Sequence, residues 1–245
     1  MSSYQQLALC YDDMTGDVHY EYRADYLEKL FRRSDIPVHT VLDLACGTGT
    51  MTWLLTGRGY EMIGVDASAE MLAVAMTKSG DTAHVPPIFL HQSMPKLDLY
   101  GTVDAAVCCL DSLNYLTRPA DVQRTLERLR LFIAPGGTLI FDVNTEEKFR
   151  MMDDQVFLDE TEDACCIWRT RYRRRICTYH VDIFRRRGNL WQRHEEEHRQ
   201  RYYSTQELCA LLEATGFGRI RVYGECRMRP PRDGEQRIYF SCIRL

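Results

Sequence analysis

Residues 41–50 (VLDLACGTGT) constrain the fold more than any other segment of the chain. The first four are apolar except for Asp43, as in a buried strand, and Gly47 and Gly49 follow in a turn. Glycine has no Cβ, so it accepts a positive φ and lets another group approach the backbone closely. A helix that begins near Thr50 would direct its free N–H groups toward a group above the turn. The segment therefore predicts a strand, a turn and a helix that bind a nucleotide-like ligand.

One carboxylate indicates which nucleotide. A dinucleotide fingerprint needs a third glycine where this chain has Thr52, and the carboxylate of Asp43 would repel a pyrophosphate. The same carboxylate would attract the sulfonium and amino groups of S-adenosylmethionine. Residues 43–49 (DLACGTG) accordingly resemble motif I of the class I S-adenosylmethionine-dependent methyltransferases, with Ala45 at the first glycine position. A dehydrogenase, or a glycine-rich turn in an unrelated α/β protein, is the alternative.

The composition of the chain narrows the possible classes of protein further. The chain has 245 residues, 45% of them hydrophobic, which fits one large domain or one domain with an insertion. Its formal net charge of −4 gives no general basic field for nucleic acid, and no apolar stretch has the length of a membrane span. Residues 1–13 lack a signal-peptide pattern, so we expect a cytoplasmic protein. We expect its 10 cysteines, none of them in a Cys-x-x-Cys pair, to be reduced thiols.

A second carboxylate follows the next predicted strand. Residues 62–66 are typical of a buried strand, and its last residue, Asp66, falls about 20 residues past the glycine turn. Carboxylates at that point bind ribose hydroxyls in nucleotide-binding folds, because one carboxylate accepts two hydrogen bonds from a diol. Ser68 is predicted to cap a helix over residues 69–78. This pattern indicates an adenosine ribose beside Asp66.

Two further strands complete the predicted half-sheet. Residues 87–94 and 103–110 are predicted strands, and the second closes on the polar segment 111–116 (DSLNYL), which resembles motif IV. That segment is not the Asn/Asp-Pro-Pro-Tyr/Phe signature of enzymes that methylate base amines. Cys109 as a nucleophile is a weaker hypothesis than Cys109 as a packed thiol. A helix over 121–132 and a Pro-Gly-Gly turn before a strand over 138–143 follow the order of the same family.

The N-terminus is predicted to cover the core. Residues 17–31 have the spacing of an amphipathic helix, within a helical cap over residues 1–36. In the family that the motifs resemble, such residues close over the cofactor, and Tyr11 is our candidate. A surface helix that covers a sheet edge is the alternative.

The resemblance implies a cofactor and its contacts. The cofactor is S-adenosylmethionine, whose product is S-adenosylhomocysteine; Ser93 and Met94 would flank the adenine, with Gln92 nearby. The full set of residues expected to bind it is Tyr11, Asp43, Ala45, Cys46, Gly47, Gly49, Asp66, Ala67, Met71, Gln92, Ser93, Met94, Leu110 and Asp111.

About sixty residues, 144–203, intervene where the family's minimal order has a helix soon after strand five. Residues 165–169, 176–184 and 190–203 have strand character, and Arg187-Gly188-Asn189 is a hairpin signal. We predict a small antiparallel sheet that acts as a lid on the substrate side. A similar insertion occurs in bacterial stand-alone methyltransferases, including small-molecule N-methyltransferases.

Two motifs in the insertion suggest other functions. Residues 194–198 (HEEEH) match a zinc protease motif, but charged neighbours and strand alternation do not fit its helix, so we expect no metal. Arginines in 169–175 and 185–187 suit RNA phosphates, although pairing with nearby acids is the preferred interpretation.

Some inserted residues are expected to face the methyl group. The candidates for catalysis are His180, His194, Arg199 and Tyr202, and the sequence leaves open which strand face is inward. After the insertion, Ser204 and Glu207 form a predicted capping box for a helix that ends near Gly216. Two last strands are predicted over 219–226 and 237–243.

The fold expected is a doubly wound α/β fold, with a mixed seven-stranded sheet, helices on both faces and a small β lid. The core would comprise residues 1–143 and 204–245, and the lid residues 144–203. The expected activity is methyl transfer to a nitrogen or oxygen of a small molecule. The alternatives are an RNA or tRNA methyltransferase and a non-catalytic S-adenosylmethionine-binding module. We expect a monomer or a homodimer without a membrane partner.

Overall fold

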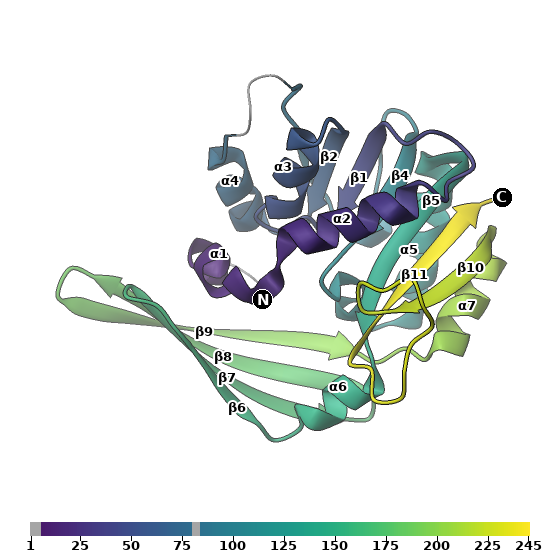
Figure 1. The fold of residues 1–245 in the computed structure, drawn as a ribbon. Helices are drawn as coiled ribbons and strands as arrows, with labels where there is room; N and C mark the ends of the chain where they lie inside the picture. Colours follow the sequence, from purple (N-terminus) through teal and green to yellow (C-terminus); the bar gives the residue numbers. More distant parts are fainter. Residues whose placement is uncertain (1–5, 80–83) are drawn as a thin grey trace.

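A mixed seven-stranded sheet forms the centre of the computed structural model, which describes residues 6–79 and 84–245 (Figure 1). Its strand order is β10-β11-β5-β4-β1-β2-β3, with β11 antiparallel to both of its neighbours and the other pairs parallel. This arrangement confirms the predicted fold class. The strands are β1 (Thr40–Leu44), β2 (Glu61–Asp66), β3 (Ile88–His91), β4 (Val103–Cys108), β5 (Ile133–Asn144), β10 (Phe217–Gly224) and β11 (Arg237–Arg244).

Helices cover both faces of this sheet, because successive side chains of a strand point to opposite sides. Val41 of β1 belongs to a buried cluster with residues of α2 and α3, and its neighbour Leu42 belongs to a second cluster with residues of α5 and α7. No helix in the described part of the chain is long and apolar enough to cross a membrane. The helices are α2 (Tyr20–Phe31), α3 (Thr50–Gly57), α4 (Ala69–Thr77), α5 (Pro119–Phe132), α6 (Glu146–Met151) and α7 (Thr205–Ala214), with short 3-10 turns η3 (Met94–Lys96) and η4 (Ser112–Tyr115).

The sequence predicted the caps of α4 and α7 correctly, but it predicted the starts of β5 and α2 less well. Ser68 caps α4 by accepting a hydrogen bond from the Met71 N–H at 3.2 Å, and the predicted capping box opens α7. The Pro-Gly-Gly segment is not the predicted turn: β5 already begins at Ile133 and runs through it, with Gly136 at φ +81°. Helix α2 begins at Tyr20 rather than residue 17, because His19 takes a left-handed conformation that breaks the helix.

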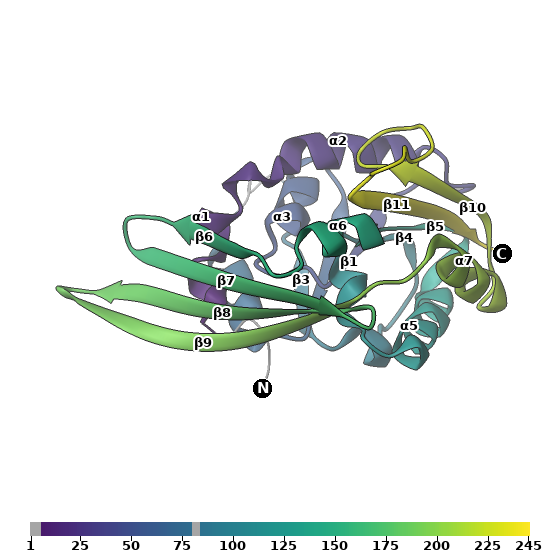
Figure 2. The same cartoon turned by 90° about the horizontal axis from the view of Figure 1, so that it is seen from below.

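The insertion forms a second, four-stranded antiparallel sheet, in agreement with the predicted lid fold. Its order is β6-β7-β8-β9, and it extends below the core in Figure 1 and across it in Figure 2. Strand β6 was not predicted, since all five of its residues are exposed and carry no buried alternation. The strands are β6 (Val156–Glu160), β7 (Ala164–Arg173), β8 (Ile176–Arg187) and β9 (Leu190–Arg201).

The described N-terminal segment contacts the inserted sheet, the glycine turn and α4. It comprises η1 (Leu7–Leu9), α1 (Tyr11–Met14) and η2 (Gly16–Val18). Leu7 and Cys10 pack in one buried cluster with Val181 and Ile183 of the inserted sheet. Residues 1–5 of the predicted cap lie outside the described residues. This segment therefore covers the carboxyl ends of the parallel strands, where ligands bind in open α/β sheets.

Candidate active site

A cavity of about 360 Å³ lies at the carboxyl ends of β1, β2 and β4. Twelve of the fourteen residues expected to bind the cofactor line this cavity; the exceptions are Gly49 and Asp111. Tyr20, Ser112, Tyr115 and Leu116 also line it, although they were not among the expected contacts. The place of Ser112, Tyr115 and Leu116 could have been inferred, since they follow the expected contact Asp111 in the same polar segment. Tyr20 has no expected contact near it in the sequence.

The glycine turn has the backbone that its composition predicts. Ala45, Gly47 and Gly49 all have left-handed φ angles, of 62°, 55° and 72°. Gly49 caps α3, and a Cβ there would come within 2.9 Å of the Ala75 Cβ and 3.0 Å of the Phe89 ring. Its role is thus close packing of α3, which explains why it does not line the cavity. Ala45 keeps a conformation that costs a residue with a Cβ roughly 1–2 kcal/mol.

Asp43 lies beneath the turn and is almost fully buried. Its Oδ2 accepts a hydrogen bond from the Thr52 hydroxyl at 2.6 Å. Burial raises the pKa of Asp43, the Thr52 hydrogen bond opposes this shift and the charge of Asp66 adds to it, so that the pKa is about 6. Thr52, at the place of the missing third glycine, therefore orients this carboxylate. The site is suited to a cation that restores the charged form.

Asp66 ends β2 and ties the turn to that strand. Its carboxylate accepts from the backbone N–H of Gly47 and of Ser68, both at 2.8 Å. Burial raises the pKa of Asp66, and these N–H bonds oppose the shift. A carboxylate has about four lone-pair sites, so two remain for the hydroxyls of a diol.

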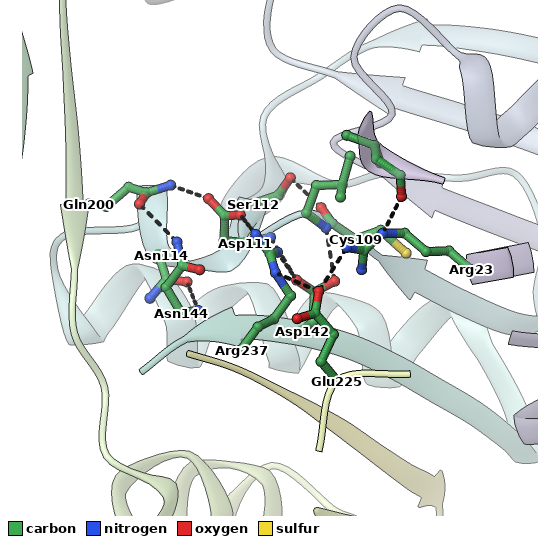
Figure 3. A network of polar contacts seen from close by, with 12 residues as sticks. Arg23, Cys109, Asp111, Ser112, Asn114, Asp142, Asn144, Gln200, Glu225 and Arg237 are labelled. Carbon is green, nitrogen blue, oxygen red and sulfur yellow. Dashed lines mark hydrogen bonds and ion pairs between the residues drawn. The ribbon is translucent and has the colours of Figure 1, made fainter. Parts of the chain in front are cut away.

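A network behind the cavity holds the loop after β4 (Figure 3). Leu110 and Asp111 have left-handed φ angles of 56° and 52°, which are rare for such residues. The buried carboxylate of Asp142 accepts both of their N–H groups, at 2.8 and 2.9 Å. Arg237 bridges Asp142 and Asp111. Asp142 was not predicted, although a lone acid within the apolar run 139–143 was a usable signal.

Asp111 is the second expected contact that does not line the cavity. Its carboxylate pairs with Arg237 and accepts from the Gln200 side chain, so it points into this network and not into the cavity. Gln200 in turn accepts from the Tyr179 hydroxyl at 2.8 Å. The Asn114 side chain donates to the Arg201 carbonyl at 2.8 Å. These contacts fasten the inserted sheet to the loop that borders the cavity.

The N-terminal segment covers the cavity from the other side. Tyr11 and Tyr20 line it, and burial raises the pKa of both hydroxyls, that of Tyr20 to about 12. Between them, Asp12 accepts from the Thr48 hydroxyl at 2.6 Å and pairs with Lys78 at 2.7 Å. This places Tyr11 where the resemblance implied a residue that covers the cofactor.

None of the four catalytic candidates lines the cavity, contrary to expectation. Alternate residues of a strand face opposite ways, so His180 and Arg199 lie on the side of the inserted sheet opposite Tyr179 and Gln200. Both border a separate groove on that side. His194 pairs with Ile183, farther along the β8–β9 ladder from the junction with the core.

The last candidate, Tyr202, follows β9. Its ring packs under the guanidinium of Arg175, 4.9 Å from the ring centroid, instead of in the cavity. The HEEEH segment lies in strand β9 and not in a helix. There His198 pairs with Glu196 at 3.1 Å, and Glu196 accepts the backbone N–H of Gln6 at 2.7 Å. The buried Glu196 of the HEEEH segment, paired with His198, therefore holds the N-terminal segment.

Comparisons with known proteins agree with this geometry. The family profile described as a methyltransferase domain matches residues 41–137. The methyltransferase-family protein YqeM of Bacillus subtilis (strain 168) is 32% identical over 242 residues, 97% of this chain and 96% of that protein. An S-adenosylmethionine-dependent methyltransferase structure from Clostridium acetobutylicum ATCC 824 matches with a TM-score of 0.87 at 24% identity, over 99% of each chain. CalS10 of Micromonospora echinaspora, an amino pentose methyltransferase with S-adenosylmethionine bound, matches with a TM-score of 0.75 at 20% identity, over 100% of this chain and 99% of that one.

The chain belongs to the class I S-adenosylmethionine-dependent methyltransferases. It is an enzyme of that class, and the methyl donor of the class is S-adenosylmethionine. The dehydrogenase alternative is thereby set aside. The polar groups of the cavity fit S-adenosylmethionine. The carboxylate of Asp43 below the turn suits its cationic groups, and the carboxylate of Asp66 at the end of β2 suits a ribose diol.

Proposed function

We propose that this enzyme methylates a nitrogen atom of a small molecule held in the cavity. The observation that carries the proposal is one cavity that the expected cofactor contacts, Tyr11 among them, share with Tyr20, Ser112 and Tyr115. The N-terminal segment, which packs against the inserted sheet, covers this cavity. CalS10, whose fold this chain shares, is described as acting on an amino pentose. A covered cavity of this size suits a small acceptor better than a macromolecule.

We assign the cofactor contacts as follows. Asp66 would bind the ribose hydroxyls, Asp43 and the turn at Gly47 would bind the methionine end, and Ser93 and Met94 would border the adenine. When bound, the cofactor supplies a methyl group on a positively charged sulfur, which an acceptor lone pair attacks while the carbon–sulfur electron pair stays on sulfur. The chain's own residues orient the acceptor and exclude water. An unprotonated amine needs no further activation.

An RNA acceptor is the rival proposal, based on the arginines of the inserted sheet. Three of the arginines in 169–175 and 185–187 are paired with acids: Arg169 with Asp182 at 2.7 Å, Arg173 with Asp153 and Arg175 with Glu207. Within the described part of the chain, the arginines of these ranges without an acidic partner at ion-pair distance are Arg171, Arg174, Arg185, Arg186 and Arg187. None of them lines the cavity, so they support phosphate binding outside it and not an acceptor within it.

The test is a labelling experiment with radioactive S-adenosylmethionine. The enzyme is incubated in parallel with a protein-free small-molecule extract of its source cells and with the RNA of the same cells. We expect label in the small-molecule sample only. Label confined to RNA, with binding that weakens steeply as salt rises, would contradict the proposal. Absence of label from both samples would contradict both classes of acceptor.

A further inference from the structure

The cavity contains negative charge and no positive charge to balance it. Among the described residues that line it, Asp43 and Asp66 are the charged ones at neutral pH. Burial raises the pKa of the thiols of Cys46 and Cys109, so both stay neutral. No lining residue is a lysine, arginine or histidine. The residues outside the described part, 1–5 and 80–83, contain none of these three types either.

The basic side chains near the cavity are engaged with other groups, and the His91 ring contacts the Ala67 carbonyl at 2.9 Å. Lys78 donates to the Thr50 hydroxyl at 2.8 Å, and its charge is paired with Asp12. Arg237 is paired with Asp111 and Asp142 in the network of Figure 3. Neither guanidinium nor ammonium is left to bind an anionic group of a second ligand.

The bound cofactor does not supply the missing charge. S-adenosylmethionine carries a sulfonium, an ammonium and a carboxylate, for a net charge of +1. With Asp43 and Asp66 ionised, the loaded cavity has a net charge of −1. An acceptor of net charge −1 would make this −2, which is unfavourable in a covered site. A zwitterionic amine would leave it at −1, with a carboxylate that no cation among the described lining residues pairs. A cationic amine would bring it to zero.

The remaining lining groups suit such an amine. Tyr11, Tyr20 and Tyr115 offer aromatic rings, and ring faces attract ammonium groups. The Ser112 hydroxyl donates to the Cys109 carbonyl at 2.8 Å, which leaves its oxygen lone pairs to accept from an N–H. Leu116 adds an apolar wall.

We infer that the acceptor is an amine that is cationic at neutral pH and carries no carboxylate, phosphate or sulfate group. This inference rests on the proposed function and narrows its substrate class. The amine binds as a cation, loses its proton to water and attacks as the neutral form, so the charge of the ammonium selects the substrate and is not present at transfer.

The first test sorts the acceptor by charge. The small-molecule extract is separated at pH 7 into cations, a neutral and zwitterionic fraction, and anions, and each is incubated with the enzyme and labelled S-adenosylmethionine. We expect at least tenfold more label from the cation fraction, in a product whose mass spectrum shows no carboxyl, phosphate or sulfate group. Label mainly from another fraction, or a product with such a group, overturns the inference and leaves the proposed function intact. Label from no fraction overturns both.

The second test measures binding without transfer. The complex with S-adenosylhomocysteine is exposed to the cation fraction, and retained molecules are recovered by ultrafiltration. We expect Leu116→Lys to lower retention of the amine that the first test identifies about tenfold or more, because this change adds a positive charge to the cavity wall. Leu116→Met, of similar length without charge, should lower retention far less than Leu116→Lys does. Thr178→Lys, which adds the charge at the outer groove, should retain the amine. Equal retention by Leu116→Lys, with S-adenosylhomocysteine still bound, overturns the inference.

Discussion

At the scale of single residues, Asp43 and Asp66 differ in what surrounds them. The Asp66 carboxylate accepts hydrogen bonds from two backbone N–H groups and organises the turn. The Asp43 carboxylate is buried and accepts one hydrogen bond, from the Thr52 hydroxyl. Both could be recognised from sequence, because an acid at the end of or within an apolar strand has no packing reason to be there.

Replacement of Asp66 tests the ribose assignment. We expect Asp66→Ala to weaken S-adenosylhomocysteine binding by about 1–3 kcal/mol, since it leaves two ribose hydroxyls without an acceptor. Calorimetry measures the change. Asp98→Ala, at an exposed carboxylate paired with Arg128, is the control and should leave the affinity unchanged. An unaltered affinity in Asp66→Ala would refute the assignment.

The raised pKa of Asp43 predicts a pH dependence of cofactor binding. Below its folded pKa of about 6 the carboxylate takes up a proton and loses its attraction for the cofactor's cationic groups. Affinity should therefore be constant from pH 7 to 8 and fall by roughly tenfold per unit below about pH 6. In Asp43→Asn, the affinity should be low and nearly independent of pH. A wild-type affinity that stays constant down to pH 5 would contradict a charged Asp43.

At the scale of elements, the loop after β4 depends on a carboxylate from β5 and a guanidinium from β11. Removal of Arg237 leaves Asp142 buried without its cation, and breaking a buried pair costs about 3–5 kcal/mol. We expect Arg237→Met to lower the free energy of unfolding by this amount in urea titrations. Arg118→Met, at an exposed pair with Asp121, should change it by less than about 1 kcal/mol. Equal effects of the two changes would rule out a structural role for the network.

The contacts of α1 predict slower ligand exchange than an open cavity would show. Asp12 joins the N-terminal segment to the start of α3 through Thr48 and to α4 through Lys78. Loss of these contacts in Asp12→Ala is worth about 1–2 kcal/mol, so S-adenosylhomocysteine should dissociate roughly 5- to 30-fold faster. Stopped-flow displacement measures the rate. Asp13→Ala, an exposed neighbour, should behave as wild type, and no change in Asp12→Ala would exclude a covering role.

At the scale of the whole molecule, two sheets meet across the N-terminal segment. The core fold was predictable because motif I, the acid of β2 and the caps of α4 and α7 are local signals. The inserted sheet was predictable in kind but not in orientation, since alternation alone does not say which face is inward. His180 and Arg199 illustrate this limit. The pair of Asp142 with Arg237 joins residues 95 positions apart, and no local pattern reports such a contact.

The structure of the complex with S-adenosylhomocysteine tests the central claim most directly. We predict the ribose hydroxyls on the Asp66 carboxylate, the amino group toward Asp43, and the sulfur facing the space bordered by Tyr11, Ser112 and Tyr115. A nucleoside bound elsewhere, or a cavity that takes up a nicotinamide dinucleotide in its place, would contradict it.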